Sequence, residues 1–158
     1  MMLVTTRTLT INAAFFQEIK DDNVRLRELL CEADAALGKH RITLRPAAIV
    51  NVLRQLQDQL AMHFSLEERL GYFEDAIQAA PRLSAQADIL RSQHEQLYMA
   101  IVELADDAER ILYREPNAQA LRVVACRFRS FHDQLTRHEE AENELIMHSL
   151  YIDLGSGD

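Results

Sequence analysis

The feature that most constrains this chain is a set of four long segments, each carrying an apolar stripe at steps of three and four residues. Such a stripe lies along one face of an α-helix and has to be buried against another element. Gly38 and the three prolines, Pro46, Pro81 and Pro116, fall at the ends of these segments. Because every connection is short, consecutive helices should lie antiparallel. The sequence therefore predicts an all-α fold, a single up-and-down antiparallel four-helix bundle.

Helix-end signals give the expected bounds of these helices. Asn12, Ser84 and Asn117 are suited to cap a helix N-terminus, Pro46 suits a first helical turn, and Gly38 suits a helix stop. No linker or repeat divides the chain into smaller units. The expected helices cover residues 12–38, 46–80, 84–114 and 117–150, with residues 1–11 as an N-terminal extension and residues 151–158 as a C-terminal tail.

Composition and charge exclude several classes of function. The formal net charge is −8 at pH 7, which argues against binding to nucleic acid or to an anionic membrane surface. No apolar run approaches the length of a membrane span, and the N-terminus lacks the organisation of a signal peptide. We therefore expect a cytoplasmic protein. Cys31 and Cys126 lie far apart without CxxC spacing, so both are expected to be reduced thiols.

Six polar residues occupy stripe positions that should be apolar. When the chain is folded about its predicted turns, these residues fall at one height in all four helices. A buried imidazole or carboxylate without a partner costs on the order of one to several kcal/mol, so this layer needs either a bound metal ion or mutual hydrogen bonds. The six residues are Asn23, His63, Glu67, His94, His138 and Glu142.

The residue types in this layer favour metal binding. His63 with Glu67, and His138 with Glu142, are spaced four residues apart, so each pair can point at one centre from one helical face. Three imidazoles and two carboxylates form a nitrogen and oxygen ligand set that suits iron, manganese or zinc. The alternative is a metal-free polar cluster held by hydrogen bonds between histidine and glutamate.

The pattern His63xxxGlu67, then His94, then His138xxxGlu142 on successive helices resembles the hemerythrin-like (HHE cation-binding) domain family over about residues 12–150. That resemblance implies a four-helix bundle around a non-haem di-iron centre. It also implies that Glu67 and Glu142 bridge the metals, that His63 binds one iron, and that His94 and His138 bind the other.

Two positions depart from the family pattern. Asn23 stands where the family has a first-helix histidine, and Tyr98 stands where oxygen-carrying members have a second third-helix histidine. An amide oxygen is a weaker ligand than imidazole, and a phenol more commonly packs against the neighbouring helix. Asn23 and Tyr98 are therefore additional candidate site residues beside the five ligands, and one or two iron ions per chain, or another divalent metal, are expected.

The resemblance implies a protein that binds or senses a small ligand such as oxygen, nitric oxide or peroxide, or iron itself, rather than a dedicated enzyme. The alternative function is a metal-free four-helix bundle acting as an interaction or regulatory module. A ferritin-like oxidase is disfavoured because no histidine here follows a glutamate by three residues. The protein partner and the oligomeric state are left open.

Overall fold

The computed structural model describes residues 2–38, 44–69, 77–78, 80–114 and 117–155. Within these ranges the long elements are all α-helices and there is no strand, which confirms the predicted all-α class. The elements are α1 (Met2–Leu37), α2 (Pro46–Arg69), the short 3-10 helix η1 (Pro81–Leu83), α4 (Ser84–Tyr113) and α5 (Ala118–Gly155).

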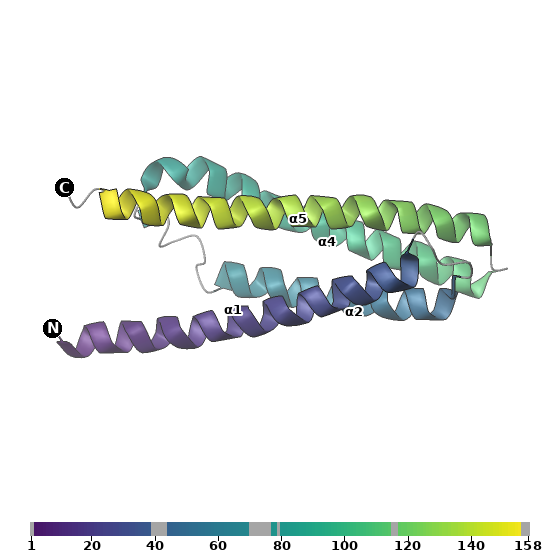
Figure 1. The fold of residues 1–158 in the computed structure, drawn as a ribbon, viewed down its shortest axis with the longest axis horizontal. Coiled ribbons are helices and arrows are strands. Elements are labelled where there is room, and N and C mark those ends of the chain that lie inside the picture. The colour runs from purple at the N-terminus through teal and green to yellow at the C-terminus, as the bar shows by residue number, and fades with distance from the viewer. Residues whose placement is uncertain (1, 39–43, 70–76, 79, 115–116, 156–158) are drawn as a thin grey trace.

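The four long helices form an up-and-down bundle. The first long helix packs against α2, α2 against α4, and α4 against α5, while α1 and α5 have the fewest mutual contacts of the neighbouring pairs. Figure 1 shows the consequence of this order, with the N-terminus and the C-terminus at the same end of the molecule. The edge between α1 and α5 is therefore the most open side of the bundle.

Two of the helices are longer than the sequence signals predicted. The first begins at Met2, so Asn12 lies inside α1 instead of capping its start, and residues 2–11 continue the helix. The last runs to Gly155, past the predicted end near Leu150. Capping residues stabilise a helix end but do not break a helix, and neither stretch contains an internal glycine or proline that would do so.

The other helix ends agree only in part with the predictions. The described part of α2 runs to Arg69, and residues 70–76 and 79 of the predicted second helix lie outside the described residues. Ser84 is the first residue of α4 and not its cap, because η1 leads directly into the helix from Leu83. At the start of α5 the prediction is confirmed, since Asn117 Oδ1 accepts hydrogen bonds from two backbone N–H groups, those of Gln119 (2.9 Å) and Ala120 (3.4 Å).

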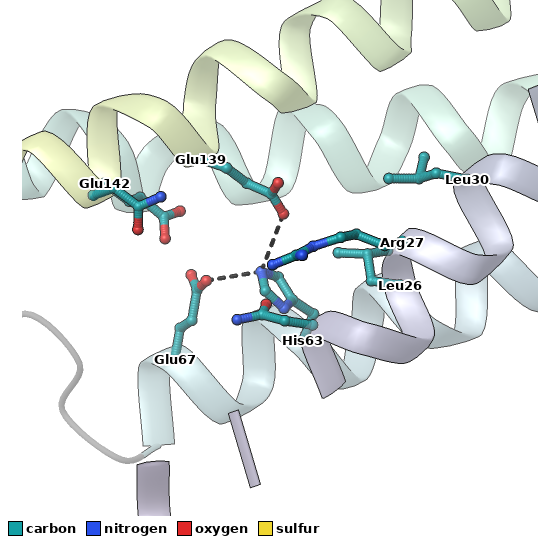
Figure 2. A pocket seen from close by; sticks show the side chains of 9 residues that line it. Leu26, Arg27, Leu30, His63, Glu67, Glu139 and Glu142 are labelled. Atoms are coloured by element: carbon teal, nitrogen blue, oxygen red, sulfur yellow. Dashed lines mark ion pairs between the residues drawn. The ribbon is translucent and has the colours of Figure 1, made fainter. Parts of the chain in front are cut away.

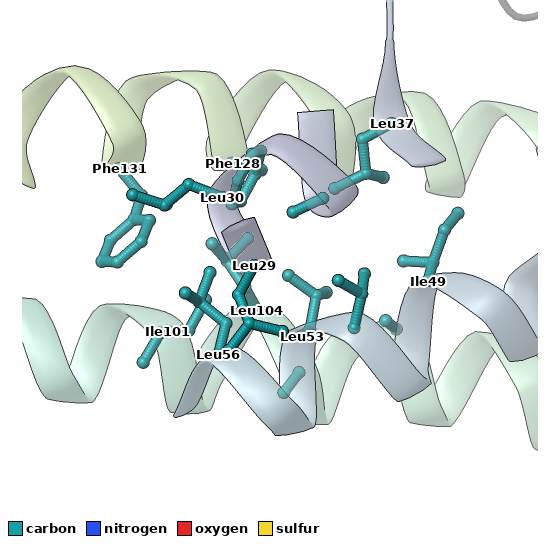
Figure 3. Packing of buried hydrophobic residues seen from close by; sticks show 14 of the residues in the cluster. Leu29, Leu30, Leu37, Ile49, Leu53, Leu56, Ile101, Leu104, Phe128 and Phe131 are labelled. Atoms are coloured by element: carbon teal, nitrogen blue, oxygen red, sulfur yellow. The ribbon is translucent and has the colours of Figure 1, made fainter. Parts of the chain in front are cut away.

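The apolar stripes meet in two separate clusters of buried side chains. The larger cluster includes Leu29, Leu53, Leu104 and Phe128, drawn from all four long helices (Figure 3). The smaller cluster lies near the other end of α4 and α5 and includes Leu90 and Leu145. Along α4, His94 falls between Leu90 of the small cluster and Leu97 of the large one. A polar layer therefore interrupts the bundle core between two apolar regions.

Two further sequence expectations can be compared with the described residues. Cys31 and Cys126 are free thiols, as predicted, and both are exposed. Among the helices of the described ranges, none combines the length and the apolar character needed to cross a membrane.

Candidate metal centre

The polar layer is formed by five buried side chains from three helices. The second helix supplies the first pair, α4 supplies one histidine, and α5 supplies the second pair. Each of the five is between 3% and 5% exposed, which is rare for groups of this polarity. These residues are His63, Glu67, His94, His138 and Glu142.

Four of these side chains point their donor atoms at one small volume. One ligand atom from each of Glu67, His94, His138 and Glu142 lies within 4.8 Å of the others. His94 Nε2 is 3.0 Å from Glu67 Oε2 and 3.4 Å from Glu142 Oε1, and His138 Nε2 also pairs with Glu142 Oε1. Two imidazoles and two carboxylates thus surround a common centre.

His63 lies at the edge of this group and shares one of its carboxylates. Its Nε2 atom is 2.8 Å from Glu67 Oε1, while the other oxygen of Glu67 faces His94. Figure 2 shows His63 and Glu67 facing each other, with Glu142 across the same space on α5. Glu67 therefore stands between His63 and the four-residue group.

The outer nitrogen of each histidine faces an oxygen acceptor. His63 Nδ1 contacts Asp22 Oδ2, His94 Nδ1 is 3.3 Å from Glu68 Oε1, and His138 Nδ1 is 2.8 Å from Gln93 Oε1. A donated Nδ1–H in each case leaves the Nε2 lone pair directed inward, which is the tautomer that a metal ion requires. All three rings are thus oriented by a neighbour outside the cluster.

Several of the inward-facing atoms lack a hydrogen-bond partner. His63 Nε2, Glu67 Oε2 and His138 Nε2 are buried and, within the described residues, make no hydrogen bond of acceptable geometry. Leaving such atoms unsatisfied costs about 1–3 kcal/mol each. Cations bound at the cluster would satisfy these atoms, and their nitrogen and carboxylate chemistry suits iron, manganese or zinc. The residues present therefore fit a metal ion.

Without metal, the cluster is held by ion pairs that shift the pKa of its members. Burial alone would lower the pKa of His63, but its close contacts with the carboxylates of Asp22 and Glu67 outweigh burial and raise that pKa to about 10. For His94 burial is likewise outweighed, by close contacts with Glu142 and Glu67, and its pKa rises to about 9. Burial would raise the pKa of Glu67, yet its pairing with both histidines lowers that pKa to about 2. A metal ion therefore competes with protons for the histidine nitrogens.

An aromatic side chain that the stripe analysis did not include supports the histidine rings. Phe64 is buried and stacks on His94, with ring centroids 4.3 Å apart and planes inclined by 11°. It also meets His63 and His138 edge-on, at 5.6 Å and 6.1 Å between centroids. The signal that could have found it is its position directly after His63, where a large apolar residue can close the layer from one side.

From the first helix, Asp22 contacts the polar layer, whereas the sequence points to its neighbour Asn23. Asp22 is only 6% exposed, contacts His63 through Oδ2 and accepts a hydrogen bond from Gln59 through Oδ1 at 2.6 Å. Asn23 is half-buried and lines a cavity beside His63 and Glu67. The strict three- and four-residue stripe selected Asn23 and missed Asp22, because a helix face is wide enough to bury both neighbours in part.

The structure places the remaining candidates as follows. Tyr98 is half-buried and packs against the large apolar cluster; among the described residues it belongs neither to the polar cluster nor to its cavity. Glu68, next to Glu67 in the chain, is largely exposed and contacts His94. Glu139, which directly follows His138 on α5, also lines the cavity. Its pKa is raised mainly by burial, opposed by His63 and reinforced by the nearby charges of Glu142 and Glu67.

A cavity of about 80 Å³ opens beside the cluster at the edge between α1 and α5. This volume can hold a few atoms of the size of water. Polar groups from α2 and α5 face apolar and basic side chains from α1 across it (Figure 2). It is lined by Asn23, Leu26, Arg27, Leu30, His63, Glu67, Glu139, Glu142 and Asn143.

The fold and the cluster together define a class, the four-helix bundles that carry a histidine and carboxylate layer able to hold metal between their helices. The family model of the hemerythrin HHE cation binding domain matches residues 14–150, so the chain belongs to this family. Neither the curated proteins nor the solved structures include a significant match to the chain.

Proposed function

We propose that this chain is a non-haem iron protein of the hemerythrin type, which binds or senses a small ligand such as oxygen, nitric oxide or peroxide, or iron itself, in the cytoplasm. The observation that carries the proposal is the convergence of inward-facing imidazole nitrogens and carboxylate oxygens, three of which have no hydrogen-bond partner within the described ranges. Family membership supports a cation at this place.

In this proposal each cluster residue has a defined role. His94 and His138 would hold a cation with their Nε2 atoms, Glu67 and Glu142 would hold it with their carboxylate oxygens, and His63 would contribute on the side of α1. Iron held by such a set supplies a redox-active Lewis acid to which a small ligand can bind. Asp22, Glu68 and Gln93 keep the three rings in the required orientation.

Access to the cluster supports a small ligand over a large one. The cavity beside His63 and Glu67 has a volume of about 80 Å³, far below the roughly 300–1,000 Å³ of sites for drug-sized molecules. Its lining combines polar groups with Leu26 and Leu30, which limits the water that can enter. A diatomic molecule or peroxide fits these dimensions.

One observation favours the second candidate function, a metal-free interaction or regulatory module. The cluster can satisfy much of its charge internally, because His63 and His94 both pair with Glu67. A network of this kind fixes the register of a bundle without any ion. The two functions differ in whether the purified chain holds metal.

Metal analysis of the purified protein, with an absorption spectrum recorded in air, tests the proposal. We expect one or two iron ions per chain and ferric absorption. His138→Ala should weaken metal binding at least about tenfold, because it removes a nitrogen from the four-residue centre. His148→Ala is the matched control on the same helix, since His148 is exposed.

The result that contradicts the proposal is a wild-type chain without metal, even after anaerobic reconstitution with ferrous iron. In that case the cluster is a structural polar network, and the interaction module becomes the better description. Equal metal content in wild type and His138→Ala would show that any bound metal lies elsewhere.

A further inference from the structure

Glu139 is a carboxylate on α5 that belongs to neither of the family's histidine and glutamate pairs. It follows His138 directly and precedes Glu142 by three residues. Residues three apart are neighbours on a helix surface, whereas adjacent residues diverge. Around α5, Glu142 therefore stands between His138 on the side of α4 and Glu139 on the side of the cavity.

The contacts of Glu139 place it at the end of the layer that faces α1. Its Oε1 atom lies 3.8 Å from His63 Nε2, and its side chain is 35% exposed. Figure 2 shows the carboxylate directed across the cavity toward His63, from the helix opposite Glu67. His63 Nε2 thus faces carboxylates from two different helices.

The charges around this cavity are unbalanced. Its lining includes three carboxylates, those of Glu67, Glu139 and Glu142, against one permanent cation, that of Arg27. The buried His63 faces the same space, with a side chain only 4% exposed and an Nε2 atom that has no hydrogen-bond partner among the described residues. With His63 neutral, as a metal ligand must be, Arg27 balances one of the three carboxylates, and a divalent cation can balance the other two.

We propose that Glu139 is a metal ligand that takes the place of the family's first-helix histidine. With His63 and the shared carboxylates of Glu67 and Glu142, it completes a second cation position beside the one formed by His94 and His138. This inference rests on the proposed function, that the layer holds metal. Asn23 lines the same cavity, but its neutral amide is the weaker ligand.

The two positions would differ in chemistry. The first offers the nitrogens of both His94 and His138 together with carboxylate oxygens. The second offers one nitrogen, from His63, and oxygens from up to three carboxylates. A position rich in carboxylate favours harder cations such as manganese or ferrous iron, so the two sites should fill in sequence.

Manganese titration of the metal-stripped full chain tests this inference, with bound metal measured after equilibrium dialysis. Manganese alone is the probe because it suits mixed nitrogen and oxygen ligands. We expect two manganese ions per wild-type chain. In Glu139→Gln the ion held by His94 and His138 should bind as before and the other at least about tenfold more weakly, because a neutral amide replaces the carboxylate.

Two controls separate ligation from other effects of the change. Glu140→Gln removes the same charge from an exposed neighbour on the same helix and should still bind two ions. Unchanged binding of one ion in Glu139→Gln shows that the layer of that variant is folded, and its circular dichroism melting curve checks the bundle as a whole.

Each contrary result points to a specific failure. A wild-type chain that binds no manganese and no iron overturns the proposed function together with this inference. A wild-type chain that holds a single ion overturns the inference alone, and so does a Glu139→Gln variant that holds two with unchanged affinity. Equal weakening in Glu140→Gln would assign the effect to net charge instead of ligation.

Discussion

At the scale of single residues, the site depends on what lies behind the histidines as much as on the ligands themselves. Asp22 is buried, and it contacts His63 Nδ1 while its other oxygen accepts from Gln59. A carboxylate in this position fixes the ring orientation and raises the basicity of Nε2. The first helix therefore acts on the site through an orienting group, although it lacks the histidine of the family pattern.

Asp22→Asn should weaken metal binding by about 10- to 100-fold, the usual range for the loss of an orienting partner of a ligand histidine. The amide keeps the shape of the side chain and removes its charge. Asp21→Asn is the matched control, because Asp21 is exposed and bonds only to Gln17 among the described residues. Manganese titration compares the variants, and equal affinities would show that Asp22 has no role in metal binding.

At the scale of elements, the two long helices α2 and α5 each deliver a histidine and a glutamate from one face. The spacing of four residues achieves this only if the helix is regular through the site and begins in the correct register. For α5 that start is fixed by Asn117, whose side chain bonds to the N–H groups of Gln119 and Ala120. The cap lies far along the helix from Glu142, so it should affect stability without touching the site.

Asn117→Ala should therefore lower the free energy of unfolding by about 1 kcal/mol, the typical cost of losing an N-cap. Metal content should not change. Asn51→Ala serves as the control, because Asn51 is exposed in the interior of α2, where alanine favours the helix. Urea denaturation measures the difference; a variant as stable as wild type would show that the observed cap contributes nothing.

At the scale of the whole molecule, the bundle tolerates a charged layer in its core because opposite charges meet there. In the metal-free protein, raised histidine pKa values stabilise the fold fully below the unfolded pKa of 6.5, and this stabilisation is lost as the pH rises through about 9 to 10. The lowered pKa of Glu67 stabilises the fold above 4.5, and this contribution is lost as the pH falls toward 2.

The contribution of His63, His94 and Glu67 to the stability of the metal-free protein should consequently be greatest between about pH 4.5 and 6.5. Urea denaturation after chelation, at pH 3, 5.5 and 9.5, measures this dependence. Stabilisation by bound metal should instead increase as the pH rises, because a metal ion binds only deprotonated imidazoles. At a free metal concentration about 100-fold above Kd we expect the melting temperature to rise by about 5–10 °C, with a larger rise at pH 8 than at pH 5.5. Stability that stays flat between pH 5.5 and 9.5 would contradict the ion-pair description of the cluster.

The sequence by itself determined the fold class, the order of the helices and the polar layer. Helical periodicity is a local property, and equal chain distances from short turns place His63, His94 and His138 at one height whatever the details of packing. The cap at Asn117 was likewise readable, because its hydrogen bonds span only three residues. The starts of α1 and α4 were not, since capping residues such as Asn12 and Ser84 also occur inside helices.

Only the tertiary structure decided which polar side chains surround the layer. Asp22 and Asn23 are adjacent on α1, and the tilt of that helix against α2 buries the aspartate beside His63. Glu139 lies in the charged run RHEEAENE, and the sequence does not distinguish it from its charged neighbours. In the structure it lines the cavity at the open edge between α1 and α5. Periodicity fixes the face of a helix to within about a residue, whereas a contact depends on how two helices are rotated and spaced, and the sequence of neither helix alone specifies that.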